Sequence, residues 1–227
     1  MRAYFFSFFL IFFSSCLKRR IMKIIEKTLQ LLFPEPCIHC ENPNVHHLHL
    51  CCCCFAELPQ TLRKHSPPEL IKNCWGLGSY SGPMGALIRR CKYKPDRNII
   101  EMLSKRIAKA SADLPAPDIV THVPTAFSRI YKRGFDQAHI LAQNIAEYKK
   151  IEHRTLLKRI DHTPQSSRST KDRLCDLSAR FQAIAPVPPN VLIVDDVLTT
   201  GGTLEACAME LLNHGAEQIN AIVLCIS

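Results

Sequence analysis

The chain has 227 residues, 47% of them hydrophobic and 22% charged, which is typical of a soluble globular protein and excludes a wholly disordered chain, a collagen-like chain and a polytopic membrane protein. Its 29 basic and 20 acidic residues give a formal net charge of +9. Such a basic balance favours partners that carry phosphate groups, whether small anions or nucleic acids, without choosing between them.

The first 21 residues form a hydrophobic leader that differs from the rest of the chain. They carry four basic residues and no acidic one, so the chain from Met22 onward has 25 basic and 20 acidic residues and a net charge of +5. The apolar run from Ala3 to Phe13 is too short to span a bilayer comfortably. Because basic residues follow this run and Met22 comes just after them, we favour translation from Met22 and a cytoplasmic protein. A genuine leader that associates the protein with a membrane is the alternative.

Residues 22–66 are predicted to form a short helix followed by a cysteine-rich module. Apolar residues at helical spacing predict the helix over residues 23–33. Six of the 12 cysteines of the chain fall between residues 37 and 54 and include two C-x2-C pairs. Two such turns can aim four thiolates at one tetrahedral zinc ion. We therefore expect a closed, structural Zn²⁺ site in a zinc-ribbon-like module, with the ligands Cys37, Cys40, Cys51 and Cys54.

The register of this site is open at the second pair. Residues 51–54 are four consecutive cysteines, so a neighbouring thiol could replace an expected ligand. The alternative to a zinc site is that Cys52 and Cys53 simply continue a cysteine-rich tract. Histidines of the same stretch are further candidate ligands, although exposed hairpin residues are the more common role for them; they are His39, His46, His47 and His49.

Residues 67–227 are predicted to form one parallel α/β domain. Strands are expected at residues 74–80, 119–123, 154–160, 191–194 and 219–226, where short apolar segments are bounded by turn residues. Helices are expected at residues 84–92, 98–110, 135–148 and 203–214, where apolar residues recur at helical spacing. Strands that alternate with helices are typical of a parallel sheet flanked by helices. The polar segment of residues 161–172 has no hydrophobic period and is predicted to be a mobile loop.

The stretch of residues 191–203 carries the strongest chemical signal. An apolar strand ends in two adjacent acids, Asp195 and Asp196, and ligands of open α/β sheets bind outside the carboxyl ends of the strands. Gly201 and Gly202 let the backbone come close to a ligand, and the free N–H groups at the start of the following helix favour an anion. Hydroxyl donors are added by Thr199, Thr200 and Thr203.

Two carboxylates in contact with a phosphate would repel it, so Asp195 and Asp196 are expected to face another part of the same ligand. A vicinal diol or a Mg²⁺ ion fits them, which indicates a phosphorylated sugar. The stretch is not a P-loop, because it lacks the G-x4-G-K-[S/T] pattern. A generic strand–loop–helix with a chance pair of acids is the alternative.

A second stretch, Pro124 to Gln137, follows a predicted strand and carries three cations beside Gly134. A single cation is usually a solvated surface residue, but three in one loop suit a pyrophosphate. The candidate residues are Thr125, Arg129, Lys132, Arg133 and Gly134.

Residues 191–203 resemble the 5-phosphoribosyl-1-pyrophosphate (PRPP) signature of type I phosphoribosyltransferases. The resemblance implies that Asp195 and Asp196 hold the ribose hydroxyls, that the Thr/Gly turn holds the 5′-phosphate and that Mg²⁺ accompanies PRPP. It also implies that residues 124–137 form the pyrophosphate loop. The polar loop would then close over the site as a lid, with Arg159, Arg168 and Arg173.

The order and spacing of further segments resemble the ComF family, phosphoribosyltransferase-like proteins linked to natural competence and DNA uptake. These segments are the cysteine module, residues 80–83, 92–94, 133–137, 163–165, Arg173, Phe181 and the paired acids. The chain departs from the family at Asp136 and Asp176, where asparagine is common, and Cys74 stands alone where a further C-x2-C pair is often found. The resemblance implies phosphoribosyl transfer to an unknown acceptor, with competence proteins as partners. The alternatives are a PRPP-binding regulator without turnover and a factor that binds single-stranded DNA.

Overall fold

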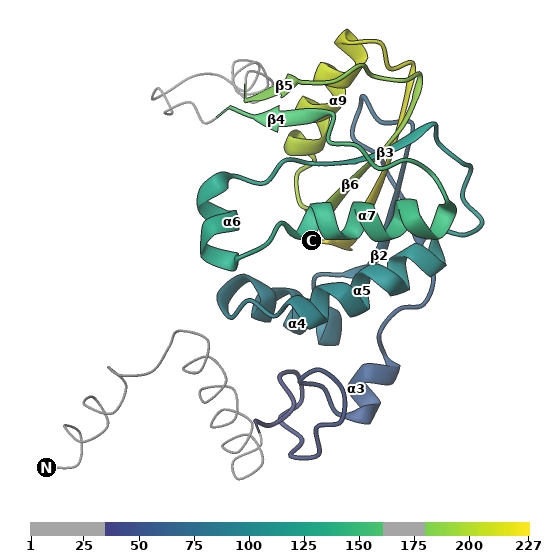
Figure 1. Cartoon of the computed structure of the whole chain (residues 1–227). Helices are drawn as coiled ribbons and strands as arrows, with labels where there is room; N and C mark the ends of the chain where they lie inside the picture. Colours follow the sequence, from purple (N-terminus) through teal and green to yellow (C-terminus); the bar gives the residue numbers. More distant parts are fainter. Residues whose placement is uncertain (1–34, 161–179) are drawn as a thin grey trace, which may run out of the picture. The chain divides into compact units, whose positions relative to one another are not determined.

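The computed structural model describes residues 35–160 and 180–227 (Figure 1). The leader of residues 1–21, the helix expected at residues 23–33 and the polar loop of residues 161–172 lie outside the described residues. None of the described helices is long and apolar enough to cross a membrane. Internal contacts divide the chain into two compact units, one that ends at Cys54 and one that begins at Phe55. The domain limits expected from the sequence, residues 22–66 and 67–227, remain a prediction.

The smaller unit folds around cysteines rather than around large apolar side chains. Its chain turns back through an antiparallel bridge between His47 and Leu50, and helix α3 (Cys52–Ala56) follows. Among residues 35–54, the buried side chains are Cys37, Leu50, Cys51 and Cys54. An apolar interior of this size stabilises little by itself, so a unit of this kind needs a metal ion or another cross-link.

Within the described residues of the larger unit, five strands form one sheet in the order β1-β2-β7-β6-β3. Strand β1 is antiparallel to β2, and all other neighbours in this sheet are parallel. Strands β4 and β5 form a second, separate antiparallel sheet of two strands. The strands are β1 (Arg63–His65), β2 (Asn73–Ser79), β3 (Ile119–His122), β4 (Leu157–Arg159), β5 (Phe181–Ala183), β6 (Asn190–Leu198) and β7 (Gln218–Ile226). The parallel α/β sheet expected from the sequence is therefore confirmed.

Helices connect the parallel strands and cover the sheet (Figure 1). Helices α5 and α7 contact each other, α7 packs against β3 and β6, and α9 packs against β5 and β7. Asp96 and Asp136 cap α5 and α7, because each side chain accepts a hydrogen bond from a backbone N–H of the first turn. The helices of this unit are α4 (Gly82–Tyr93), α5 (Arg97–Ala110), α6 (Phe127–Arg133), α7 (Gln137–Lys149) and α9 (Gly202–Asn213).

Strand β6, which lies between β7 and β3, is buried on both faces. Val191 and Ile193 belong to a hydrophobic cluster with Leu204 and Leu211 of α9. Successive strand side chains alternate between the two faces, so Leu192 and Val194 point to the opposite face, where they are also buried. A strand that is buried on both faces is rigidly held, and β6 therefore gives a fixed position to the acids that follow Val194.

The structure differs from the sequence expectations in the length of β6 and in the presence of α6, β1 and β5. Strand β6 continues through the acids to Leu198, and Asp195 still pairs with Val223 of β7. Helix α6 is separate from α7 and was missed because none of its residues is buried, which leaves no apolar period to detect. Strands β1 and β5 have three residues each, too few for an alternating pattern.

Candidate functional site

Asp195 and Asp196 lie near the carboxyl end of β6, and both side chains are half-buried. The Asp196 N–H donates a hydrogen bond to the Asp195 Oδ1 over 2.7 Å, which fixes the first carboxylate. Burial and then the neighbouring Asp196 carboxylate raise the pKa of Asp195 well above its usual range. Negative charge on this pair is therefore unfavourable until a cation or hydroxyl donors approach it, and the pair fits a Mg²⁺ ion or a sugar diol in this respect.

Arg133, the last residue of α6, brings positive charge to the acidic pair. Its Nη1 lies 3.8 Å from the Asp196 Oδ2 and donates a hydrogen bond to the Gln137 Oε1 over 2.9 Å. Gly134 ends α6 in the left-handed backbone region, with a φ of 78°. This conformation favours glycine and lets the chain turn from α6 toward α7. The turn thus holds Arg133 close to β6.

Asp136 ties the loop after β3 to the start of α7. Its Oδ1 accepts hydrogen bonds from the Thr125 hydroxyl over 3.0 Å and from the His139 N–H over 3.2 Å. Asparagine is common at this position in the family that the sequence resembles. It also offers a side-chain oxygen that accepts both bonds. The aspartate of this chain therefore keeps the geometry and adds a negative charge to the loop.

The turn between β6 and α9 presents hydroxyl and backbone donors. Thr199 and Thr200 are exposed, and Gly201 is the N-cap residue of α9, with a φ of 83°. A Cβ atom at Gly201 would lie 3.0 Å from the Pro68 Cγ, so both the backbone and the space favour glycine. The first N–H groups of α9 have no partner within the helix, and the helix dipole favours an anion there. The turn is suited to a phosphate.

A cavity of about 450 Å³ brings most of these residues together. Of the site residues predicted from the sequence, those that line it are Thr125, Arg129, Arg133, Arg159, Asp195, Asp196, Thr199 and Thr203. Other predicted residues are not part of its lining, namely Lys132, Gly134, Thr200, Gly201 and Gly202. Arg168 and Arg173 lie outside the described residues.

Sequence reasoning gave no role to three further residues of this cavity, Lys92, Arg180 and Phe181. Lys92 lies in the last turn of α4, and Phe181 begins β5 directly after Arg180. Arg159 pairs with Phe181 across β4 and β5, and its guanidinium lies 5.6 Å from the centroid of that ring. Only the fold brings these residues together, because they come from segments far apart in the sequence. The charged lining of the cavity consists of five basic and two acidic side chains, which suits a ligand with several negative charges.

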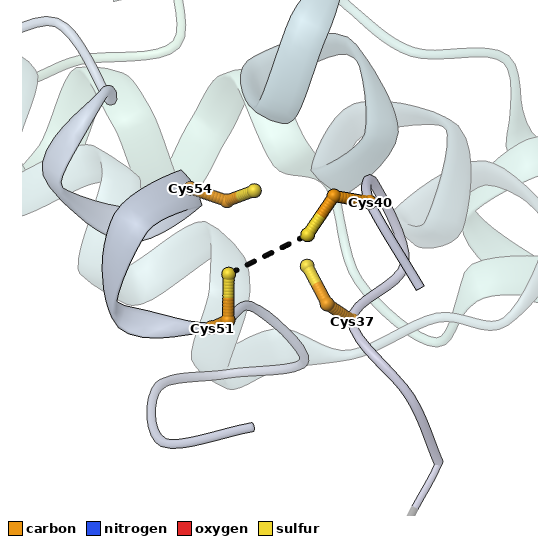
Figure 2. A group of neighbouring side chains, drawn as sticks. All are labelled: Cys37, Cys40, Cys51 and Cys54. Atoms are coloured by element: carbon orange, nitrogen blue, oxygen red, sulfur yellow. Dashed lines mark hydrogen bonds between the residues drawn. The ribbon is translucent and has the colours of Figure 1, made fainter. Parts of the chain in front are cut away.

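The four cysteines predicted as zinc ligands come together in the smaller unit. Their Sγ atoms lie within 4.8 Å of one another, and the Cys40 and Cys51 Sγ atoms are 3.6 Å apart. Figure 2 shows that the sulfurs of Cys37, Cys40, Cys51 and Cys54 point toward a common centre. Tetrahedral zinc with Zn–S bonds of about 2.3 Å places its sulfurs about 3.8 Å apart, so the cluster fits this ion. Cys52 and Cys53 are exposed.

The ionisation of these thiols also favours a bound cation. Burial disfavours the Cys37 thiolate, but hydrogen bonds from the backbone N–H groups of Cys40, Cys51 and His39 outweigh burial and lower the pKa of Cys37 to about 6. Burial and then the neighbouring thiols raise the pKa of Cys54. Four thiolates therefore cannot coexist here without a cation between them.

Comparison with known proteins relates this chain to phosphoribosyl transferase domains and to competence proteins. The model of the phosphoribosyl transferase domain family matches residues 130–226. Competence protein F of Haemophilus influenzae is 29% identical over 195 residues, which cover 81% of this chain and 81% of that protein. DNA utilization protein YhgH of Escherichia coli K12 is 27% identical over 198 residues, which cover 83% of each chain. Competence protein ComFC of Bacillus subtilis is 27% identical over 152 residues, 64% of this chain and 60% of that one. The chain is thus similar to ComF-type competence proteins over most of its length and carries a phosphoribosyl transferase domain.

The larger unit has the type I phosphoribosyltransferase fold, a parallel sheet with flanking helices. Solved structures include more distant likenesses. The allosteric regulatory enzyme of purine biosynthesis is 21% identical with a TM-score of 0.41, over 55% of this chain and 25% of that one. Purine phosphoribosyltransferase from Pyrococcus horikoshii is 16% identical with a TM-score of 0.35, over 56% of this chain and 80% of that one.

Proposed function

We propose that this ComF-type protein binds PRPP with Mg²⁺ in the 450 Å³ cavity and transfers the phosphoribosyl group to an acceptor during DNA uptake. The observation that carries the proposal is the convergence of the paired acids of β6, Arg133 and the α9 turn on one cavity. Its volume falls within the range of about 300–1,000 Å³ that small-molecule sites occupy. The names of the relatives support the link with DNA. A cytoplasmic location belongs to the same proposal.

Each part of the cavity has a role in this proposal. Asp195 and Asp196 orient the ribose hydroxyls, and their charge favours the positive charge that develops on the ring as the leaving group departs. The 5′-phosphate accepts hydrogen bonds from the turn of Thr199, Thr200, Gly201, Gly202 and Thr203. The pyrophosphate is bound by Thr125, Arg129, Lys132, Arg133 and Gly134.

Two ions complete the proposal. Bound Mg²⁺ supplies charge neutralisation to the pyrophosphate, and Asp195 and Asp196 are the residues that would hold it together with the ligand. Zn²⁺ on Cys37, Cys40, Cys51 and Cys54 stabilises the smaller unit and takes no part in the chemistry, because a site with four protein ligands has no open position.

Arg159 contributes to a lid that excludes water, and Arg168 and Arg173 keep the same expected role.

Replacing Arg133 with glutamine is expected to weaken binding of Mg²⁺-PRPP by about 10-fold to 150-fold, because a hydrogen bond to a charged group contributes about 1.5–3 kcal/mol. Lys132→Gln is expected to weaken it less, because Lys132 is exposed and does not line the cavity. Arg97→Gln is the matched control, since Arg97 is an exposed α5 residue whose Nε donates to Glu101. Calorimetric titration measures all three affinities. Unchanged affinity in Arg133→Gln would contradict the pyrophosphate assignment.

A regulator that binds PRPP without turnover would use the same cavity. Incubation of the protein with Mg²⁺-PRPP and a panel of nucleobases and amines distinguishes the two functions. Release of pyrophosphate that depends on one acceptor identifies a transferase. Tight binding without release from any acceptor identifies a regulator.

Helix α6 favours single-stranded DNA as a second candidate ligand. Phe127 is 72% exposed and Tyr131 is 84% exposed, and these two aromatic residues lie one helical turn apart. Arg129 and Lys132, on the same helix, are also exposed. Aromatic side chains beside basic ones are the usual platform on which the bases of single strands stack.

Tyr131→Ala is expected to weaken binding of a single-stranded oligonucleotide by about 5-fold to 150-fold, because stacking of one base contributes about 1–3 kcal/mol. Tyr148→Ala is the control, since Tyr148 is a half-exposed aromatic residue of α7. Fluorescence anisotropy at two salt concentrations gives both the affinity and the electrostatic share. Equal affinities for the two variants would exclude α6 as a stacking platform.

A further inference from the structure

Three histidines of the larger unit meet at a point that the sequence did not reveal. His122 ends β3, His139 lies in the first turn of α7, and His153 lies between α7 and β4. One ring nitrogen of each lies within 4.8 Å of those of the other two. The His122 Nδ1 and the His153 Nε2 are 3.2 Å apart. His122 is 5% exposed, and the other two rings are half-buried.

The backbone holds each of these histidines in place. The Val120 N–H donates to the Glu152 carbonyl over 2.9 Å and the Arg154 N–H donates to the Val120 carbonyl over 3.1 Å, which fixes His153 between them beside β3. His122 pairs with Val194 in the central sheet. The His139 N–H donates to the Asp136 Oδ1, which anchors the start of α7. The cluster is therefore built on fixed positions of the fold, which a metal site requires.

The chemistry of the cluster is that of a transition-metal site. Neutral imidazoles suit borderline divalent ions such as Zn²⁺, Co²⁺ and Ni²⁺. Tetrahedral Zn²⁺ with Zn–N bonds of about 2.0–2.1 Å places its nitrogens about 3.3 Å apart, close to the 3.2 Å between His122 and His153. The group that meets here consists of histidines alone, with no carboxylate or thiol among the described residues close enough to join it.

We propose that His122, His139 and His153 bind a divalent transition-metal ion of the zinc type, with a fourth position open to water or an anion. Three-histidine sites with an open position are a known arrangement for zinc in proteins. This site is separate from the cysteine cluster in both ligand type and position in the chain. The proposal does not rest on PRPP binding, so either proposal can fail alone.

The placement of the cluster gives the ion a structural consequence. His122 and His139 stand at the two ends of the segment that contains α6 and the Arg133 side chain. A metal ion that binds only the folded arrangement stabilises that arrangement, and here it would link both ends of this segment. The ion is therefore expected to stabilise the larger unit and to brace the loop that carries the predicted pyrophosphate residues.

Cobalt is the probe that separates the two metal sites. The purified full-length protein, with its cysteine cluster filled by Zn²⁺, is titrated with Co²⁺ and followed by visible absorption. Binding of one equivalent with d–d bands and without a thiolate-to-cobalt charge-transfer band is the expected result. His139→Gln and His153→Asn are each expected to weaken this binding by more than about 10-fold, because loss of even a supporting hydrogen bond costs a metal site that much. In thermal unfolding, Co²⁺ is expected to raise the melting temperature of the unaltered protein but not that of either cluster variant.

The control is His214→Gln, which removes a histidine at the end of α9 and leaves the cluster intact. Far-ultraviolet circular dichroism verifies that each variant is folded. If neither cluster variant folds, the spectrum of the unaltered protein decides the question. Absence of cobalt binding to that protein, or binding that persists unchanged in folded His139→Gln and His153→Asn, overturns the proposal. In that case the 3.2 Å contact is a hydrogen bond between two neutral rings.

Discussion

Asp195→Asn is expected to make the unliganded protein more stable at neutral pH. Burial and the Asp196 carboxylate raise the pKa of Asp195, so the folded state disfavours its ionised form. Asparagine keeps the side-chain oxygen that accepts the Asp196 N–H and removes the charge. The expected gain in the free energy of unfolding is about 0.5–2 kcal/mol, the usual range for a single stabilising substitution. This corresponds to a rise of a few degrees in the melting temperature for a chain of this size.

The pH dependence of this effect gives it a distinct signature. An acid whose pKa is raised by folding costs stability as the pH rises from its unfolded pKa, about 4 for aspartate, through its folded pKa. The difference between Asp195→Asn and the unaltered protein should therefore be small at about pH 4 and should grow as the pH rises above that value. Thermal unfolding across this range measures it, and Glu147→Gln, which neutralises an exposed acid of α7, is the control. A variant that is less stable than the unaltered protein at neutral pH would show that the negative charge of Asp195 does not destabilise the folded state.

Cys54→Ser is expected to abolish zinc binding by the smaller unit and to unfold residues 35–54. Structural zinc contributes about 10–16 kcal/mol of binding free energy in small finger peptides, and here few other buried side chains replace it. Zinc content measured by atomic spectroscopy should fall by one equivalent per chain. Hydrogen exchange should become fast in residues 35–54 while β6 stays protected.

Cys53→Ser is the matched control, because this neighbouring thiol is exposed and lies outside the cluster of four. It should keep its zinc and its protection from exchange. If Cys53→Ser loses zinc while Cys54→Ser retains it, the ligand register is wrong. If the unaltered protein holds no metal on its thiols, the structural-zinc proposal fails altogether.

Local patterns were sufficient to predict several strands and helices of the larger unit. Strands β2, β3 and β7 are apolar segments between turn residues, and α5 and α7 have regular apolar spacing, so their bounds agree with expectation to within two residues. The paired acids and the Thr/Gly turn were predictable for the same reason, since their chemistry lies within one continuous stretch. Helix α6 was not predictable, because it buries no side chain and its position depends on turns at both ends.

Contacts between distant segments limited the prediction of the sites. Lys92 from α4 and Arg180 beside β5 reach the cavity only through the order of the strands, which no local pattern encodes. The three-histidine cluster has the same origin, because His122, His139 and His153 have no motif spacing in common. The cysteine cluster was predictable because each C-x2-C pair is a local signal.

Calorimetric titration of Mg²⁺-PRPP into the full-length protein tests the central proposal most directly, with the variant Asp195→Asn/Asp196→Asn as its control. The account predicts saturable binding of one PRPP per chain to the unaltered protein and no measurable binding to the folded variant. Binding of equal affinity to both proteins, or absence of binding to a folded, zinc-loaded protein, would contradict the phosphoribosyl site.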